Sequence, residues 1–115
     1  MALNTEIMWT ESLSLVCTAP ATPASGDPVL CGQIPGVALT DEDTADGLTT
    51  VALNGVFRLP VKGETTTNNA VVAGDIIYYD AGVLNKDNTN GVRFGYALGG
   101  VNSGATTTIP VRIGY

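Results

Sequence analysis

Residues 74–80 read Gly-Asp-Ile-Ile-Tyr-Tyr-Asp, and this stretch indicates the fold class most clearly. Its four central residues are β-branched or aromatic, which are the types that pack well on a pleated sheet. Turn-forming residues flank them on both sides, as expected for a short strand. No window longer than about ten residues places apolar side chains at helical spacing. The chain is therefore predicted to be all-β.

An internal repeat extends outward from this stretch. Each copy contains a Gly-Asp pair before a strand, a Gly-apolar-Ala-Leu motif, and a Thr pair before a β-branched residue. These segments lie at residues 26–30, 36–39 and 49–51 in the first copy and at residues 74–78, 95–98 and 107–109 in the second. Each copy predicts a turn, two strands, a loop and a third strand. Two such similar strand units can close on each other as a small β-barrel or a sandwich, which protects their edges.

The other strands are expected between turn-rich segments. The full set of expected strands is residues 12–18, 29–31, 34–39, 49–53, 56–61, 75–80, 92–98 and 107–113. Asn54-Gly55 is a tight-turn dipeptide, and we expect it to join its flanking strands as a hairpin. The segments 41–47, 63–69 and 85–91 are expected to be polar loops or turns. This pattern predicts a single β domain over residues 12–115, preceded by an extended N-terminal arm of residues 1–11.

Several glycine and aspartate residues at the turns are interpreted as structural. Gly26 and Gly74 permit a positive φ, and the aspartate after each of them can accept hydrogen bonds from backbone amides just after it. Gly36 and Gly95 are expected to let a neighbouring backbone or a large side chain pack close. The full set is Gly26, Asp27, Gly36, Gly55, Gly74, Asp75 and Gly95.

The composition indicates a surface that is covered in the working state. The 115 residues fit one domain. Charged residues make up 14% of the chain, against a usual share of about 25%. An oligomer or a docked partner would cover such a sparsely charged surface.

The charge balance argues against nucleic-acid and membrane partners. The net charge is −6, from 11 acidic and 5 basic residues. The basic residues, which do not cluster in the sequence, are Arg58, Lys62, Lys86, Arg93 and Arg112. The positive footprint that binds nucleic acid or anionic lipid is therefore missing. No apolar run approaches the roughly 20 residues of a membrane helix. Residues 1–11 carry two acids and no base, unlike a secretory signal, so synthesis in a cytoplasm is expected.

Residues for catalysis or metal binding are scarce. The chain contains no histidine, so the usual general base and any Ser-His-Asp or Cys-His arrangement are missing. The acids that could form a catalytic pair or a calcium loop lie in expected turns or at strand ends: Asp41, Glu42, Asp43, Asp46, Asp75 and Asp80. Counted from Asp41, the fifth position of a calcium loop is Ala45, so the match to an EF-hand fails. We therefore predict no metal, no cofactor and no enzymatic activity.

The cysteines and the tyrosines each have two interpretations. Cys17 and Cys31 are interpreted as small apolar side chains in the core, and a disulfide across paired strands is the alternative. The four tyrosines are Tyr78, Tyr79, Tyr96 and Tyr115. We interpret them as half-buried sheet residues, and a sugar-stacking platform is the alternative.

The N-terminal segment is the strongest candidate for a binding element. Its apolar residues Leu3, Ile7, Met8 and Trp9 precede the first expected strand and have few local partners. They could pack onto the core of their own domain. Alternatively, the segment is an arm that orders on a partner and adds backbone hydrogen bonds to the partner's sheet. In that case Trp9 would be the natural anchor.

Several motifs, taken together, carry a resemblance to a known family. They are Gly-Asp-Pro-Val-Leu at residues 26–30, Gly-Val-Ala-Leu at 36–39, Asn-Gly-Val-Phe-Arg-Leu-Pro at 54–60, Ala-Gly-Asp-Ile-Ile-Tyr-Tyr-Asp at 73–80, and Phe-Gly-Tyr-Ala at 94–97. In this order and spacing, from about residue 12 to the C-terminus, the chain resembles the capsid cement, or head decoration, proteins of tailed bacteriophages.

The resemblance implies a β-tulip-like or small-barrel domain, commonly a homotrimer. It implies binding to the major capsid protein on the outer face of an icosahedral shell, at three-fold and quasi-three-fold positions after expansion. Related proteins use an N-terminal arm for this contact, and residues 1–11 occupy that place here. The expected function is a structural virion protein that stabilises the expanded capsid. A carbohydrate- or receptor-binding module displayed on the virion is the alternative.

Overall fold

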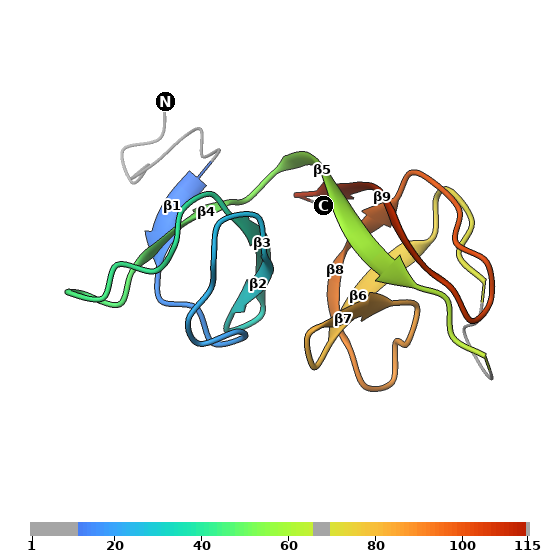
Figure 1. Ribbon diagram of the computed structural model, residues 1–115, viewed down its shortest axis with the longest axis horizontal. Helices are drawn as coiled ribbons and strands as arrows, with labels where there is room; N and C mark the ends of the chain where they lie inside the picture. Colours follow the sequence, from blue (N-terminus) through green and yellow to red (C-terminus); the bar gives the residue numbers. More distant parts are fainter. Residues whose placement is uncertain (1–11, 66–69, 115) are drawn as a thin grey trace, which may run out of the picture.

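The computed structural model describes residues 12–65 and 70–114, which form strands, turns and loops (Figure 1). The strands are β1 (Ser12–Leu15), β2 (Pro28–Cys31), β3 (Ile34–Ala38), β4 (Thr49–Ala52), β5 (Gly55–Lys62), β6 (Ile76–Asp80), β7 (Val83–Asn85), β8 (Val92–Ala97) and β9 (Thr106–Ile113). Within the described part of the chain there is no helix, and so none that could span a bilayer. The all-β prediction is confirmed.

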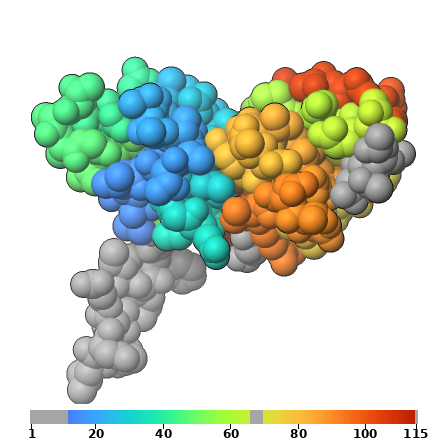
Figure 2. All heavy atoms as spheres, turned by 90° about the horizontal axis from the view of Figure 1, so that it is seen from below, coloured from blue at the N-terminus to red at the C-terminus, as the bar shows by residue number. Residues whose placement is uncertain are grey.

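The strands form two antiparallel sheets that lie side by side as two lobes (Figure 1 and Figure 2). One sheet has four strands in the order β1-β4-β3-β2, and the other has five in the order β5-β9-β8-β6-β7. Neither sheet closes on itself, because β1 and β2 end the first sheet and β5 and β7 end the second. The barrel alternative is therefore wrong for the described residues.

The chain crosses from one sheet to the other at Asn54 and Gly55. The strands on either side of this dipeptide do not pair: β4 belongs to the four-stranded sheet, and β5 pairs with β9 in the other. The predicted Asn54-Gly55 hairpin is therefore wrong. The physical reason is that β4 already lies between β1 and β3, so it has no free edge for β5. Gly55 still adopts a positive φ of 114° where the chain changes direction.

A short strand that the sequence prediction missed forms the far edge of the five-stranded sheet. Val83 to Asn85 pair with β6 as β7, so Asn85 ends a strand and does not begin a loop. Ala81 and Gly82 join β6 to β7, with φ values of 49° and 89°. Two consecutive positive φ values are typical of the tight turns that suit a hairpin.

Two buried clusters stabilise the fold. The larger one lies on the inner face of the five-stranded sheet around Phe94 and Ile77, and it also includes Leu30 from β2 and Val37 from β3. The smaller one lies on the opposite face of the four-stranded sheet and consists of Cys17, Val29, Cys31, Ala38 and Val51. Successive residues on a strand face opposite ways. The four-stranded sheet is therefore buried on both faces, and one of them packs against the other lobe.

The same backbone hydrogen bond recurs in the two sheets. The amide of Gly26 donates to the carbonyl of Ala38, and the amide of Gly74 donates to the carbonyl of Ala97, both at 2.7 Å. The first bond joins the turn before β2 to the end of β3, and the second joins the turn before β6 to the end of β8. The two Gly-Asp turns thus hold equivalent positions in the two lobes.

The third strands of the repeat align differently from the sequence prediction. Ala38 lies opposite Val51, and Ala97 lies opposite Val111. Val111 therefore holds the position of Val51, whereas the Thr pairs had suggested Ile109. A shift of two residues keeps every side chain on the same face of a sheet, so the apolar alternation could not reveal it.

Candidate binding surfaces

The two Gly-Asp turns are held by their own carboxylates. Gly26 and Gly74 have positive φ values of 92° and 97°. Oδ2 of Asp27 accepts a hydrogen bond from the amide of Ala24 at 2.9 Å, and Asp75 makes the equivalent bond 2.8 Å from the amide three residues before it. The carboxylates therefore reach back along the chain, whereas the sequence had suggested amides just after them. These residues shape the turns.

Asp75 also forms an ion pair that its counterpart Asp27 lacks within the described residues. Lys86 Nζ lies 3.1 Å from Oδ2 of Asp75. The hydrogen bond from the amide of Val72, and then the ammonium group of Lys86, lower the pKa of Asp75. The charged form of this carboxylate is thus favoured in the folded protein.

Gly36 and Gly95 lie where strands approach closely. A Cβ atom at Gly36 would overlap the side chain of Val51 and would lie 2.6 Å from the carbonyl oxygen of Ala52. A Cβ atom at Gly95 would overlap the carbonyl oxygen of Arg112. Both positions are central in their sheets, so we assign them a packing role.

The two cysteines meet in the smaller core. Their sulfur atoms lie 3.4 Å apart, both side chains are buried, and both thiols are free. Burial, and then the neighbouring Cys17 thiol, raise the pKa of Cys31 to about 12. A high pKa keeps the thiol protonated and unreactive at neutral pH. The pair therefore contributes to the core as apolar side chains, close enough for a disulfide to remain the alternative.

The acidic loop between β3 and β4 uses its carboxylates locally. Asp43 accepts a hydrogen bond from the amide of Ala45, and Asp46 accepts one from the amide of Leu48, both at 2.9 Å. In the described ranges, no three cysteine or acidic side chains come together as a metal site. The loop carboxylates form turns and are not arranged around a common centre.

The tyrosines do not share one platform. Tyr79 is buried, and its ring stacks on Phe94 with the centroids 6.3 Å apart. Tyr78 and Tyr96 are partly exposed on other positions of the sheet. Tyr115 lies outside the described residues. The geometry gives no support to a sugar-stacking surface built from these four residues.

The apolar residues of the proposed arm, Leu3, Ile7, Met8 and Trp9, lie outside the described residues. The structure does show where the described chain begins. Ser12 starts β1 and pairs with Ala52. Among the described strands, β1 has β4 as its single partner, so its other edge is open for backbone hydrogen bonds.

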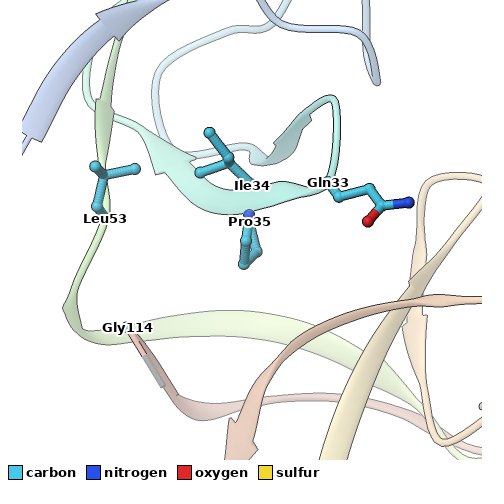
Figure 3. Close-up of a pocket in the computed structure, with 5 residues that line it drawn as sticks. All are labelled: Gln33, Ile34, Pro35, Leu53 and Gly114. Carbon is cyan, nitrogen blue, oxygen red and sulfur yellow. The ribbon is translucent and has the colours of Figure 1, made fainter.

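A pocket lies where the two lobes meet (Figure 3). The tip of the β2–β3 hairpin lines one side, and Leu53 with Gly114 lines the other. Its volume is about 270 Å³, and its side chains are mostly apolar. Ile34 at the rim is 47% exposed, so an apolar group is available there to a partner. The pocket adjoins the crossover, because Leu53 directly precedes Asn54 and Gly55.

Basic side chains gather on the outer face of the five-stranded sheet. Arg58 and Lys62 are exposed on β5, and Arg112 is exposed on β9. The guanidinium carbon of Arg93 lies 5.2 Å from the centre of the Tyr96 ring, and Tyr96 lies opposite Arg112. The basic residues that are scattered in the sequence therefore do cluster in space. We call this surface, defined by Arg58, Lys62, Arg93 and Arg112, the basic face.

Comparison with known proteins gives one match. A family model for phage cement proteins matches residues 8–113, almost the whole chain. The match begins before residue 12, where the resemblance was expected to start, and it includes Met8 and Trp9 but not Leu3 and Ile7. No curated protein and no solved structure matches the chain.

Proposed function

Because the chain belongs to the phage cement protein family, we propose that it binds the outer surface of a phage capsid and stabilises the expanded shell. The family match over residues 8–113 carries this proposal. The sheet-rich fold and the absence of histidine agree with a structural protein. The protein would be made in the host cytoplasm and end on the outer capsid surface of the virion.

The proposed partner is the major capsid protein, and the proposed assembly is a homotrimer at three-fold and quasi-three-fold positions. A shell under pressure separates at the junctions between its subunits. A protein that spans a junction adds contacts that must break first. Three linked copies bind with a high effective concentration, so each contact can be weak while the whole is tight.

The proposed capsid-binding element is residues 1–11 together with the open edge of β1. An extended segment can add a strand to a partner's sheet, in which backbone bonds give affinity and side chains give specificity. Leu3, Ile7, Met8 and Trp9 would supply those side chains, with Trp9 as the anchor. The position of Ser12 at the start of an edge strand supports this arrangement.

The proposed scaffold is one domain, residues 12–115, built from two similar strand units. The strand order β1-β4-β3-β2 corresponds to β5-β9-β8-β6, with β7 as an addition. The equivalent hydrogen bonds of Gly26 and Gly74 support this correspondence. Leu30 and Val37, which pack into the core of the other lobe, support a single folding unit.

Co-sedimentation with expanded capsid shells that lack decoration tests the function. We expect the full chain to bind to saturation and to raise the temperature at which the shells come apart. A chain without residues 1–11 should keep its β-sheet circular dichroism and its oligomeric state. We expect its affinity for shells to fall at least about tenfold, the loss of a hot-spot anchor.

Matched variants separate the arm from the rest of the surface. Trp9→Ala should reproduce most of the loss. Val72→Ala, which trims a side chain that is 63% exposed, should leave binding unchanged. If the truncated chain binds as tightly as the full chain, the arm is not the binding element. If the full chain itself fails to bind or stabilise shells, the proposed function is wrong.

A further inference from the structure

The two halves of the described chain carry opposite charge. Residues 12–54 contain five acidic residues and no basic one, a net charge of −5. Residues 55–114 contain four acidic and five basic residues, a net charge of +1. Four of those five bases form the basic face. Charge is thus separated between the lobes, although the whole chain is acidic.

The acidic side of this separation is concentrated in the loop between β3 and β4. Asp41, Glu42, Asp43 and Asp46 lie within six consecutive positions, residues 41–46, which we call the acidic loop. Three of the four acids are exposed. The loop lies at one end of the molecule, and β5 and β9 lie in the other lobe (Figure 1 and Figure 2).

Among the described residues, part of the basic face and all of the acidic loop lack ion pairs, whereas Lys62 lies 3.6 Å from Glu64. Arg58 and Arg112 form no ion pair with any described residue, and neither do the acids of residues 41–46. The backbone bonds that Asp43 and Asp46 accept fix their position but leave their charge in place. A sheet face that carries Arg58 and Arg112 without ion pairs to described residues suits a partner that presents exposed carboxylates.

We propose that the basic face binds the acidic loop of a second copy of this chain. Each copy would offer one surface of each kind, at opposite ends, so the contact is head to tail. Such a heterologous contact closes into a ring when the rotation between copies permits. This inference rests on the proposed homotrimer and identifies the surfaces through which its subunits meet.

The test measures the mass of the free full-length protein by light scattering over a dilution series, with no shells present. We expect concentration-dependent association that weakens when NaCl rises from about 50 mM to about 500 mM, because salt screens charge pairs. The double variant Arg58→Glu/Arg112→Glu should raise the dissociation constant at least about tenfold. The conservative control Arg58→Lys/Arg112→Lys should stay close to the unaltered chain.

The negative charge of the acidic loop can be reduced without losing its turns. Glu42→Lys/Thr44→Lys changes the net charge of the acidic loop from −4 to −1 and keeps the carboxylates of Asp43 and Asp46, which hold the loop. This variant should also associate at least about tenfold more weakly. Combining both sets in one chain places two glutamates on the basic face and two lysines on the acidic loop, so pairs of opposite charge can form again between copies and association should partly return. Thermal unfolding of each variant identifies any that fails to fold. If only one of the two double variants folds, its association alone still tests the contact.

The outcomes separate this inference from the proposed function. A chain that stays monomeric at every concentration and low salt overturns the head-to-tail contact, as does a combined variant that does not recover. Arginine variants that associate normally but lose shell binding would assign the basic face to the capsid and also overturn it. If the free protein associates as expected but does not bind shells, the contact stands and the cement function fails.

Discussion

The two lobes have similar backbones but different side chains. Both begin with a Gly-Asp turn, and Gly26 and Gly74 donate the same hydrogen bond at 2.7 Å. In the five-stranded sheet the core is filled by large side chains such as Phe94 and Ile77. In the four-stranded sheet the separate core is filled by small ones, including Cys17 and Cys31. The comparison shows that turn and ladder bonds set the path of the chain while the core and the surface vary.

The charge of the lobes diverges in the same way. The four-stranded lobe has no basic residue, and the outer face of the other lobe gathers four. Surface side chains on a strand can change without disturbing the ladder, because they point away from the core. One folding pattern can therefore present two surfaces of opposite charge. The variants below compare the cores, the strand contacts and the turns of the two lobes.

The largest effect is expected from the core of the five-stranded lobe. Phe94 is fully buried, and Phe94→Ala should lower the free energy of unfolding by about 4 kcal/mol. Val51→Ala in the other lobe removes less buried surface and should cost about 2 kcal/mol. Calorimetry should show one transition that moves in both variants, because Leu30 and Val37 connect the lobes. Two transitions, of which each variant moves one, would show that the lobes are separate domains.

The close approach of strands should be nearly as sensitive. Gly95→Ala would place a methyl group against the carbonyl oxygen of Arg112, and we expect a loss of about 3 kcal/mol in urea unfolding. Gly36→Ala should be similarly harmful. Gly100→Ala is the control, because its Cβ would meet nothing nearer than 3.4 Å. A harmless Gly95→Ala would mean that the strands can separate at little cost.

The two turn carboxylates should differ by the ion pair with Lys86. Asp75→Asn should cost about 1 kcal/mol, and Asp27→Asn should cost less. The pKa of Asp75 is lowered in the folded state. The contribution of its carboxylate to the free energy of unfolding is therefore present above the unfolded pKa of about 3.9, and it disappears as the pH falls through the folded pKa. Urea midpoints between pH 2 and pH 6 measure this. Equal losses in the two variants would show that Lys86 adds nothing.

The smallest effect on stability concerns the thiols. The pKa of Cys31 is raised to about 12 in the folded state. The contribution of its protonated thiol to the free energy of unfolding is therefore complete below the ordinary pKa of about 8.5 and declines as the pH rises toward 12. At pH 8, Ellman's reagent should label the folded protein at least about tenfold more slowly than the unfolded protein. Intact mass gives the oxidation state. A fully oxidised pair after purification in reductant-free buffer would establish the disulfide alternative.

The local pattern of the sequence was sufficient for much of the fold. Alternating apolar residues and turn dipeptides placed eight of the described strands close to their observed bounds. The buried cysteines and the close approach at Gly95 also followed from residue types and their spacing. Such features depend on neighbours in the chain or on the period of a strand, which a sequence displays directly. The family resemblance was equally accessible, because it rests on ordered motifs.

The tertiary structure decided which strands pair. Asn54-Gly55 has the composition of a hairpin turn, yet β4 had no free edge, so the chain crossed to the other sheet. A two-residue shift in β9 was invisible in the alternation because it leaves every face unchanged. The basic face arose from residues up to 54 positions apart, Arg58 and Arg112, which share a surface through β5–β9 pairing. Strand periodicity is local, whereas edges, register and shared faces depend on long-range pairing.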